Sequence, residues 1–106
     1  VENIIGSGLS DRLVGGSAST RIEGRAGDDR IAAFAGNDTL LGEFGNDVLE
    51  GGKSSDQLFG GDGADTLNGG TGFDTLNGEV GQDAVSYADR TAGVSVNLAN
   101  GVALTG

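Results

Sequence analysis

The chain has 106 residues, of which 22 are glycine, and it contains no histidine, cysteine, proline, methionine or tryptophan; 16 acidic and 6 basic side chains give a formal net charge of -10. A chain of this length predicts one small domain with little interior to bury. The missing residue types exclude thiolate or histidine zinc sites, disulfides and histidine-activated nucleophiles. The excess of carboxylates argues against a nucleic acid partner. The chain also lacks the long apolar run that would predict a membrane span.

A repeat begins within the first residues and continues along the chain. A branched aliphatic residue recurs every nine residues, at Ile4, Leu13, Ile22, Ile31, Leu40, Leu49, Leu58, Leu67, Leu76, Val85 and Val94. Self-similarity at a fixed short period is the signature of a repeat protein. Because each unit supplies only one residue to a core, no unit is stable alone, and burial requires coil stacked on coil.

Aspartate and glycine share this period. Two residues before each aliphatic residue from Leu13 to Val85 lies an aspartate, replaced once by threonine: Asp11, Thr20, Asp29, Asp38, Asp47, Asp56, Asp65, Asp74 and Asp83. Glycine often lies two residues earlier again and at the start of the unit. Each unit therefore predicts a six-residue polar turn, in which glycine permits positive φ, and then a three-residue strand with its central side chain inward.

The C-terminal stretch has a different pattern. Val94, Val96 and Leu98 alternate with polar residues, and Asn100-Gly101 is a strong signal for a type I′ turn. We expect residues 87–106 to form a β-hairpin that caps the exposed strand edge of the last repeat. Tyr87 is expected to pack against the core or the sheet edge.

Two consecutive units, residues 60–68 and 69–77, match the pattern G-G-x-G-x-D-x-U-x, where U is a large aliphatic residue. On these motifs the chain resembles the calcium-binding RTX nonapeptide repeats of secreted bacterial proteins, over about residues 6 to 86. The resemblance implies an all-β fold, a parallel β-roll (β-solenoid) with two nonapeptides per turn. We expect a single domain with residues 1–14 as the first turn, 15–86 as the core repeats and 87–106 as the cap.

The resemblance also implies that Ca²⁺ binds between the aspartates of neighbouring loops, with about five ions in all. The aspartates are Asp29, Asp47, Asp65 and Asp83 on one edge and Asp38, Asp56 and Asp74 on the other. Each ion would also take carbonyl oxygens from positions two and four of the earlier loop and positions one and three of the later loop. For the ion between Asp47 and Asp65 these carbonyls belong to Glu43, Gly45, Gly60 and Asp62. The other glycines expected at the metal sites are Gly27, Gly36, Gly42, Gly51, Gly52, Gly61, Gly63, Gly69 and Gly78. Six oxygen ligands, mostly from flexible backbone, suit Ca²⁺ better than Mg²⁺.

Some units depart from the pattern. Thr20 removes a charged ligand and Ala33 replaces a glycine, so we expect no ion between Thr20 and Asp38. The first loop lacks glycine at position four, which leaves an ion between Asp11 and Asp29 open.

Lys53, Ser54 and Ser55 are expected to weaken the two sites that involve Asp56 without removing its carboxylate. The side chains of Asp28, Asp62 and Asp89 are expected to be solvated surface charges.

The function implied by the resemblance is a calcium-responsive module of a larger secreted bacterial protein. Carboxylate repulsion and a thin core predict an extended chain at low Ca²⁺, suited to the type I secretion machinery, and folding on Ca²⁺ binding outside the cell. The expected partners are calcium ions, that machinery in transit and neighbouring domains, and the chain is expected to be a monomer.

Three alternatives stay open. The chain could be a calcium-rigidified spacer or ligand-binding segment of a surface adhesin, or an accessory module of a secreted enzyme. A metal-free solenoid whose aspartates only shape turns is also possible. Catalysis by the chain itself is not expected, because its ordered carboxylates are committed to ions.

Overall fold

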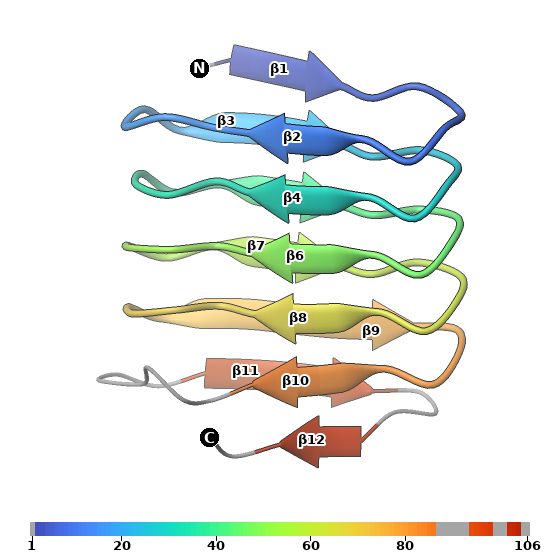
Figure 1. Cartoon of the computed structure of the whole chain (residues 1–106). Coiled ribbons are helices and arrows are strands. Elements are labelled where there is room, and N and C mark those ends of the chain that lie inside the picture. The colour runs from blue at the N-terminus through green and yellow to red at the C-terminus, as the bar shows by residue number, and fades with distance from the viewer. Residues whose placement is uncertain (1, 87–93, 99–101, 105–106) are drawn as a thin grey trace.

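The computed structural model describes residues 2–86, 94–98 and 102–104, and these form short β-strands and no helix (Figure 1). The strands are β1 (Glu2–Ile5), β2 (Arg12–Val14), β3 (Thr20–Glu23), β4 (Arg30–Ala32), β5 (Thr39–Leu41), β6 (Val48–Glu50), β7 (Gln57–Phe59), β8 (Thr66–Asn68), β9 (Asp74–Glu79), β10 (Ala84–Ser86), β11 (Val94–Leu98) and β12 (Val102–Leu104). Within these ranges the chain has no helix that is long and apolar enough to cross a membrane.

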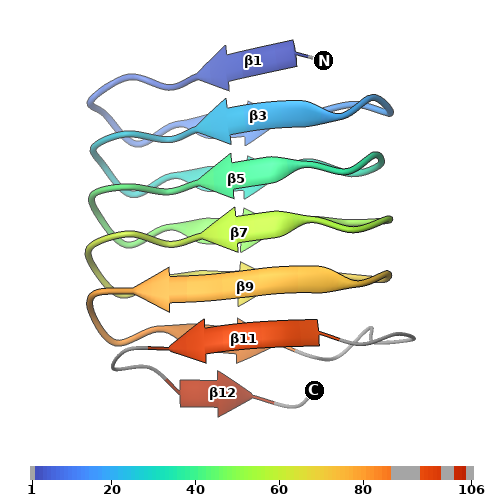
Figure 2. The ribbon, with the colours of Figure 1, turned by 180° about the vertical axis from the view of Figure 1, so that it is seen from behind.

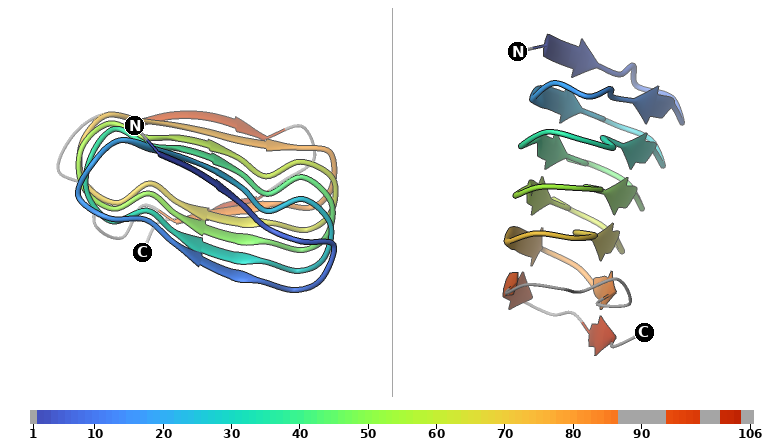
Figure 3. Two further views of the ribbon diagram at one scale, coloured as in Figure 1. Left: turned by 90° about the horizontal axis from the view of Figure 1, so that it is seen from above. Right: turned by 90° about the vertical axis from the view of Figure 1, so that its left-hand side faces the viewer.

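The strands alternate between two parallel sheets. One sheet has the order β1-β3-β5-β7-β9-β11 and the other β12-β10-β8-β6-β4-β2, and Figure 2 shows the first of these from its outer side. Each strand pairs with the strand two places along the chain, so that Leu40 lies between Ile22 and Leu58 in register. Seen along the stack, the two sheets face each other and loops close both edges (Figure 3). The expected parallel β-roll with two nonapeptides per turn is confirmed.

The core is a double ladder of single aliphatic side chains. Ile22, Ile31, Leu40, Leu49, Leu58, Leu67, Leu76 and Val85 are at most 1% exposed, whereas Ile4 and Leu13 are only partly buried against them. Complete burial of such a side chain contributes about 1.5 to 3 kcal/mol. The ladder is therefore complete in the middle turns and incomplete at the N-terminal end.

The C-terminal prediction was wrong in two respects. β11 and β12 do not form a hairpin: they lie in different sheets, and each continues the roll by parallel pairing, β11 with β9 and β12 with β10. The register partner of Leu76 is Val96, and Val94 instead pairs with Asp74, so the nine-residue spacing ends at Val85. Because Val94, Val96 and Leu98 alternate with polar residues, the sequence period alone did not determine which of them is the register partner of Leu76. Tyr87 and the Asn100-Gly101 turn lie outside the described residues.

Candidate metal sites

An aspartate ends each loop between residues 6 and 83 except the one that ends at Thr20, and these aspartates are connected from turn to turn along both edges of the roll. The N–H of Asp29 donates to Oδ1 of Asp47 (2.8 Å), that of Asp47 to Oδ1 of Asp65 (2.8 Å), and that of Asp65 to Oδ1 of Asp83 (2.9 Å). The structure thus brings together the carboxylates that the sequence pairs on this edge.

The opposite edge has the same arrangement. The N–H of Asp38 donates to Oδ1 of Asp56, and that of Asp56 to Oδ1 of Asp74, both at 2.9 Å. Aspartates that are 18 residues apart in the sequence are therefore neighbours in the structure on both edges.

The second carboxylate oxygen of most of these aspartates has no partner. The side chains are 1% exposed, and Oδ2 of Asp29, Asp38, Asp47, Asp56, Asp65 and Asp83 is buried without a hydrogen bond. A buried acceptor without a donor costs about 1–3 kcal/mol, and more when it is charged. Each of these atoms therefore requires either a proton or a cation.

Glycine at loop position one keeps space open beside this oxygen. A Cβ on Gly42 would lie 2.5 Å from Oδ2 of Asp47 and 2.7 Å from the carbonyl oxygen of Gly60 in the next turn. These two oxygens are among the ligands that the family resemblance implies for one ion. A buried carboxylate oxygen without a donor and a backbone carbonyl oxygen of the next turn close to it are ligands of the kind that an oxygen-coordinated cation needs, so the residues present fit a hard cation such as Ca²⁺.

Loop positions two and four adopt left-handed backbone in every loop from residue 24 to residue 83. In the loop that ends at Asp29 these are Arg25 (φ 69°) and Gly27 (φ 95°), and in the loop that ends at Asp65 they are Gly61 (φ 88°) and Gly63 (φ 114°). The two earlier loops, residues 6–11 and 15–20, have no residue with positive φ. Positions two and four are those whose carbonyls the family resemblance assigns to ions.

Burial also changes the protonation of the aspartates. Desolvation raises the pKa of Asp47 to about 6, that of Asp56 to about 7 and that of Asp65 to about 8, although a backbone N–H donated to each carboxylate lowers the pKa in part. Neighbouring aspartates on the same edge add to the increase. Desolvation raises the pKa of Asp29, Asp38 and Asp83 as well. Carboxylates in this state gain strongly from a divalent counter-ion.

The departures in the sequence have distinct outcomes. Asp11 is partly exposed, and its Oδ2 accepts the N–H of Ser7 at 2.6 Å, so it lacks the orphaned oxygen of the later loops. Thr20 occupies the aspartate register, and its hydroxyl donates to the carbonyl of Ala18 (3.0 Å). Ser54 is left-handed (φ 77°) at position four although it is not glycine, so the loop keeps the conformation of its neighbours.

A second ladder at loop position five was missed by the sequence analysis. Asp28 is exposed, as expected, but its Oδ1 accepts the N–H of Asn46 (2.7 Å), and Oδ1 of Asn46 accepts the N–H of Ala64 (2.8 Å). On the other edge, Asn37 accepts the N–H of Ser55 (3.0 Å). The recurrence of Asp or Asn at position five was the available signal, since both residue types bond readily to nearby backbone.

Carboxylates alone do not form a metal site here: the described part of the chain holds no group of three or more acidic side chains that could hold a metal ion. Backbone carbonyls must complete any coordination shell, as the arrangement of positions one, two and four allows.

Comparison with known proteins agrees with this geometry. No curated protein matches the chain. The family model described as RTX calcium-binding nonapeptide repeat (4 copies) matches residues 5–33, 14–49, 33–67, 42–76 and 59–88. These matches span most of the roll, and the chain belongs to the RTX calcium-binding nonapeptide repeat family, whose members bind Ca²⁺.

Proposed function

We propose that the chain is a calcium-dependent folding module that binds five Ca²⁺ ions between successive turns. The ions lie between Asp29 and Asp47, Asp47 and Asp65, and Asp65 and Asp83 on one edge, and between Asp38 and Asp56, and Asp56 and Asp74 on the other. The observation that carries the proposal is the buried Oδ2 without a hydrogen bond in at least one aspartate of every pair.

The count of five has independent support in the backbone. Each of these ions takes two carbonyls from an earlier loop whose positions two and four are both left-handed, such as Glu43 (φ 72°) and Gly45 (φ 105°) for the ion between Asp47 and Asp65. The loops that end at Asp11 and Thr20 lack this conformation. We therefore assign no ion between Thr20 and Asp38, and we propose that the position between Asp11 and Asp29 is empty or weak.

The energetics explain why folding depends on the metal. The roll buries one aliphatic side chain per nine residues and, on each edge, a row of carboxylates whose ionised forms repel one another. Five divalent ions would supply enough positive charge to neutralise the formal net charge of -10. Because the unfolded chain has no preformed site, the free energy of calcium binding is folding free energy.

This coupling suits a protein that crosses membranes unfolded. At the low Ca²⁺ of the bacterial cytosol the chain stays extended for the type I secretion machinery, and it folds in the Ca²⁺-rich exterior as part of a larger secreted protein. The family match supports the secreted location and the bacterial source that this proposal requires. The module has a structural role, and catalysis is assigned to no residue.

Circular dichroism of the full chain tests the proposal. After removal of metal by a chelator, we expect a disordered spectrum at neutral pH, with a cooperative change to β-structure on addition of Ca²⁺ and a much weaker response to Mg²⁺. A chain that is already folded without metal, or that responds equally to both ions, would contradict it. Calorimetric titration then measures the number of ions.

A further inference from the structure

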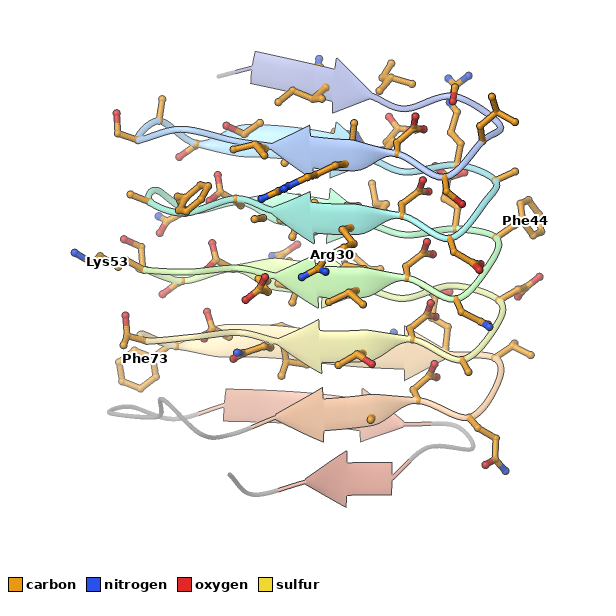
Figure 4. The ribbon with its side chains drawn as sticks, viewed as in Figure 1. Arg30, Phe44, Lys53 and Phe73 are labelled. Carbon is orange, nitrogen blue, oxygen red and sulfur yellow. The ribbon has the colours of Figure 1, made fainter. Side chains whose placement is uncertain are left out.

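An open groove of about 370 Å³ lies on the outer face of the sheet that contains β3, β5, β7 and β9. It extends to the edge of the roll where the loops that contain Glu43 and Asp62 lie. Its floor includes Leu41 and Phe59, which are register neighbours on β5 and β7. Phe44 lines its outer rim and is 60% exposed. Figure 4 shows Phe44 at this loop edge, on the side of the roll opposite to Lys53 and Phe73.

The groove exists because one loop position lacks a side chain. Glu43, Gly61 and Glu79 occupy loop position two in three successive turns, and all three line the groove. All three also have left-handed backbone, with φ of 72°, 88° and 64°. Gly61 therefore leaves a notch between two glutamates, which keep side chains in a conformation that ordinarily favours glycine.

The charges around this apolar floor are almost all negative. Glu43, Asp62 and Glu79 line the groove, and Oε2 of Glu43 is buried and has no hydrogen-bond partner. The one cation in the lining, Arg21, lies 3.3 Å from Glu23 (Nε to Oε2), which also lines the groove. Four carboxylates and one arginine surround the apolar floor, so the groove is complementary to a cationic donor carried on an apolar segment.

We propose that this groove is a docking site for an extended peptide segment of a partner protein, in which an arginine or lysine is flanked by aliphatic side chains. The cationic side chain lies over the Gly61 notch between Glu43 and Glu79, and its aliphatic neighbours cover Leu41 and Phe59. Cation–π contact with Phe44 adds to the interaction. The inference rests on the proposed function in one respect: the Glu43 and Asp62 carbonyls are ligands of the ion between Asp47 and Asp65, so the groove forms only in the calcium-loaded roll.

The test uses the full chain with saturating Ca²⁺, after circular dichroism has shown that it is folded. The probe is a short fluorescent peptide with one arginine between two leucines, and its binding is followed by fluorescence anisotropy. A peptide with glutamate in place of arginine is the matched probe of opposite charge. We expect saturable binding of the arginine peptide and at least about tenfold weaker binding of the glutamate peptide.

Variants locate the binding. Glu43→Gln keeps the backbone carbonyl and should weaken the arginine peptide about threefold to tenfold, and Phe59→Ala should do so by a similar factor. Glu50→Gln removes the same charge from an exposed carboxylate of β6 in the other sheet, and it should change binding by less than about twofold. Each variant is first titrated with Ca²⁺, to show that its folding is unchanged.

Three results would overturn the inference while leaving the proposed function intact. These are a folded, calcium-loaded chain that binds neither peptide, equal losses in the Glu43 and Glu50 variants, and full displacement of the peptide by spermine with no effect of Phe59→Ala. The last result would mean that the surface only collects cations. A chain that does not fold with Ca²⁺ would instead refute the proposed function.

Discussion

The first loop and the loops in the middle of the roll use the same aspartate position differently. Asp11 is partly exposed, and Ser7 satisfies its carboxylate through both the N–H and the hydroxyl. Asp65 is 1% exposed, its Oδ2 has no partner, and burial raises its pKa to about 8. The same position of the nine-residue repeat therefore leaves an unpartnered buried oxygen in one loop and a satisfied one in the other.

The two loops differ in the neighbours that the structure describes. Asp65 is bonded to loops on both sides, which end at Asp47 and Asp83, whereas Asp11 is bonded, within the described residues, to one neighbouring loop, which ends at Asp29. The aliphatic ladder shows the same gradient, because Leu67 is fully buried and Leu13 only partly. An aspartate with solvent access shapes its own turn, and an aspartate between two turns needs a counter-ion.

Replacement of the two aspartates by asparagine should separate these roles most clearly. Asp65→Asn keeps an oxygen acceptor but removes the charge that two of the proposed ion sites share, so it should raise the Ca²⁺ concentration for half-folding at least about tenfold. It should also increase any β-structure of the metal-free chain at neutral pH, because folding no longer requires protonation of this buried carboxylate. Calcium titration followed by circular dichroism measures both effects.

Asp11→Asn is the matched control for this change and should shift the calcium midpoint by less than about threefold. Equal shifts in the two variants would mean that the first loop binds an ion as tightly as the middle loops, and the proposed count would be wrong.

The aliphatic ladder provides the second contrast. Leu67→Ala leaves a cavity between two sheets and should cost about 2–5 kcal/mol of the free energy of unfolding at saturating Ca²⁺. Leu13→Ala removes a side chain that is only partly buried and should cost about 1 kcal/mol. Denaturant unfolding at fixed Ca²⁺ measures both, and a larger loss at Leu13 would show that the first turn is packed as well as the middle.

The dependence on pH should have opposite signs with and without metal. In the metal-free fold the pKa values of Asp47, Asp56 and Asp65 are raised to about 6, 7 and 8 from an ordinary value of 3.8. Stability of this fold is therefore highest in acid and falls as pH rises from about 4 to about 8, because the unfolded chain releases its protons first. Acidification from about pH 8 to about pH 5 should increase β-structure without Ca²⁺ and, at limiting Ca²⁺, should release ions by competition. A metal-free spectrum that is constant over this range would contradict the buried carboxylates.

The sequence predicted the repeats correctly, because the repeating aliphatic residue fits only the core position and the repeating aspartate fits only the end of the loop. The positions of Leu67 and Asp65 followed from strict spacing, because a one-residue shift would turn the strand over. The end of the roll could not be predicted in this way, since Val94 and Val96 are both aliphatic and only the parallel pairing with β9 shows that Val96 is the register partner of Leu76. The groove at Gly61 also required the structure, because its walls come from strands and loops of different turns.

The smallest expected effect concerns backbone strain and should change sign between the middle and the start of the roll. Ser54 has φ of 77°, a conformation that costs a residue with a Cβ about 1 kcal/mol, so Ser54→Gly should raise the free energy of unfolding by up to about 1 kcal/mol. Ala18 holds the same position four in the loop of residues 15–20, where no residue has positive φ. Ala18→Gly therefore adds only freedom to the unfolded chain and should lower the free energy of unfolding by about 0.5 kcal/mol. Thermal unfolding at saturating Ca²⁺ compares the two, and a gain at both positions would mean that the first loops also adopt the left-handed conformation when metal is bound.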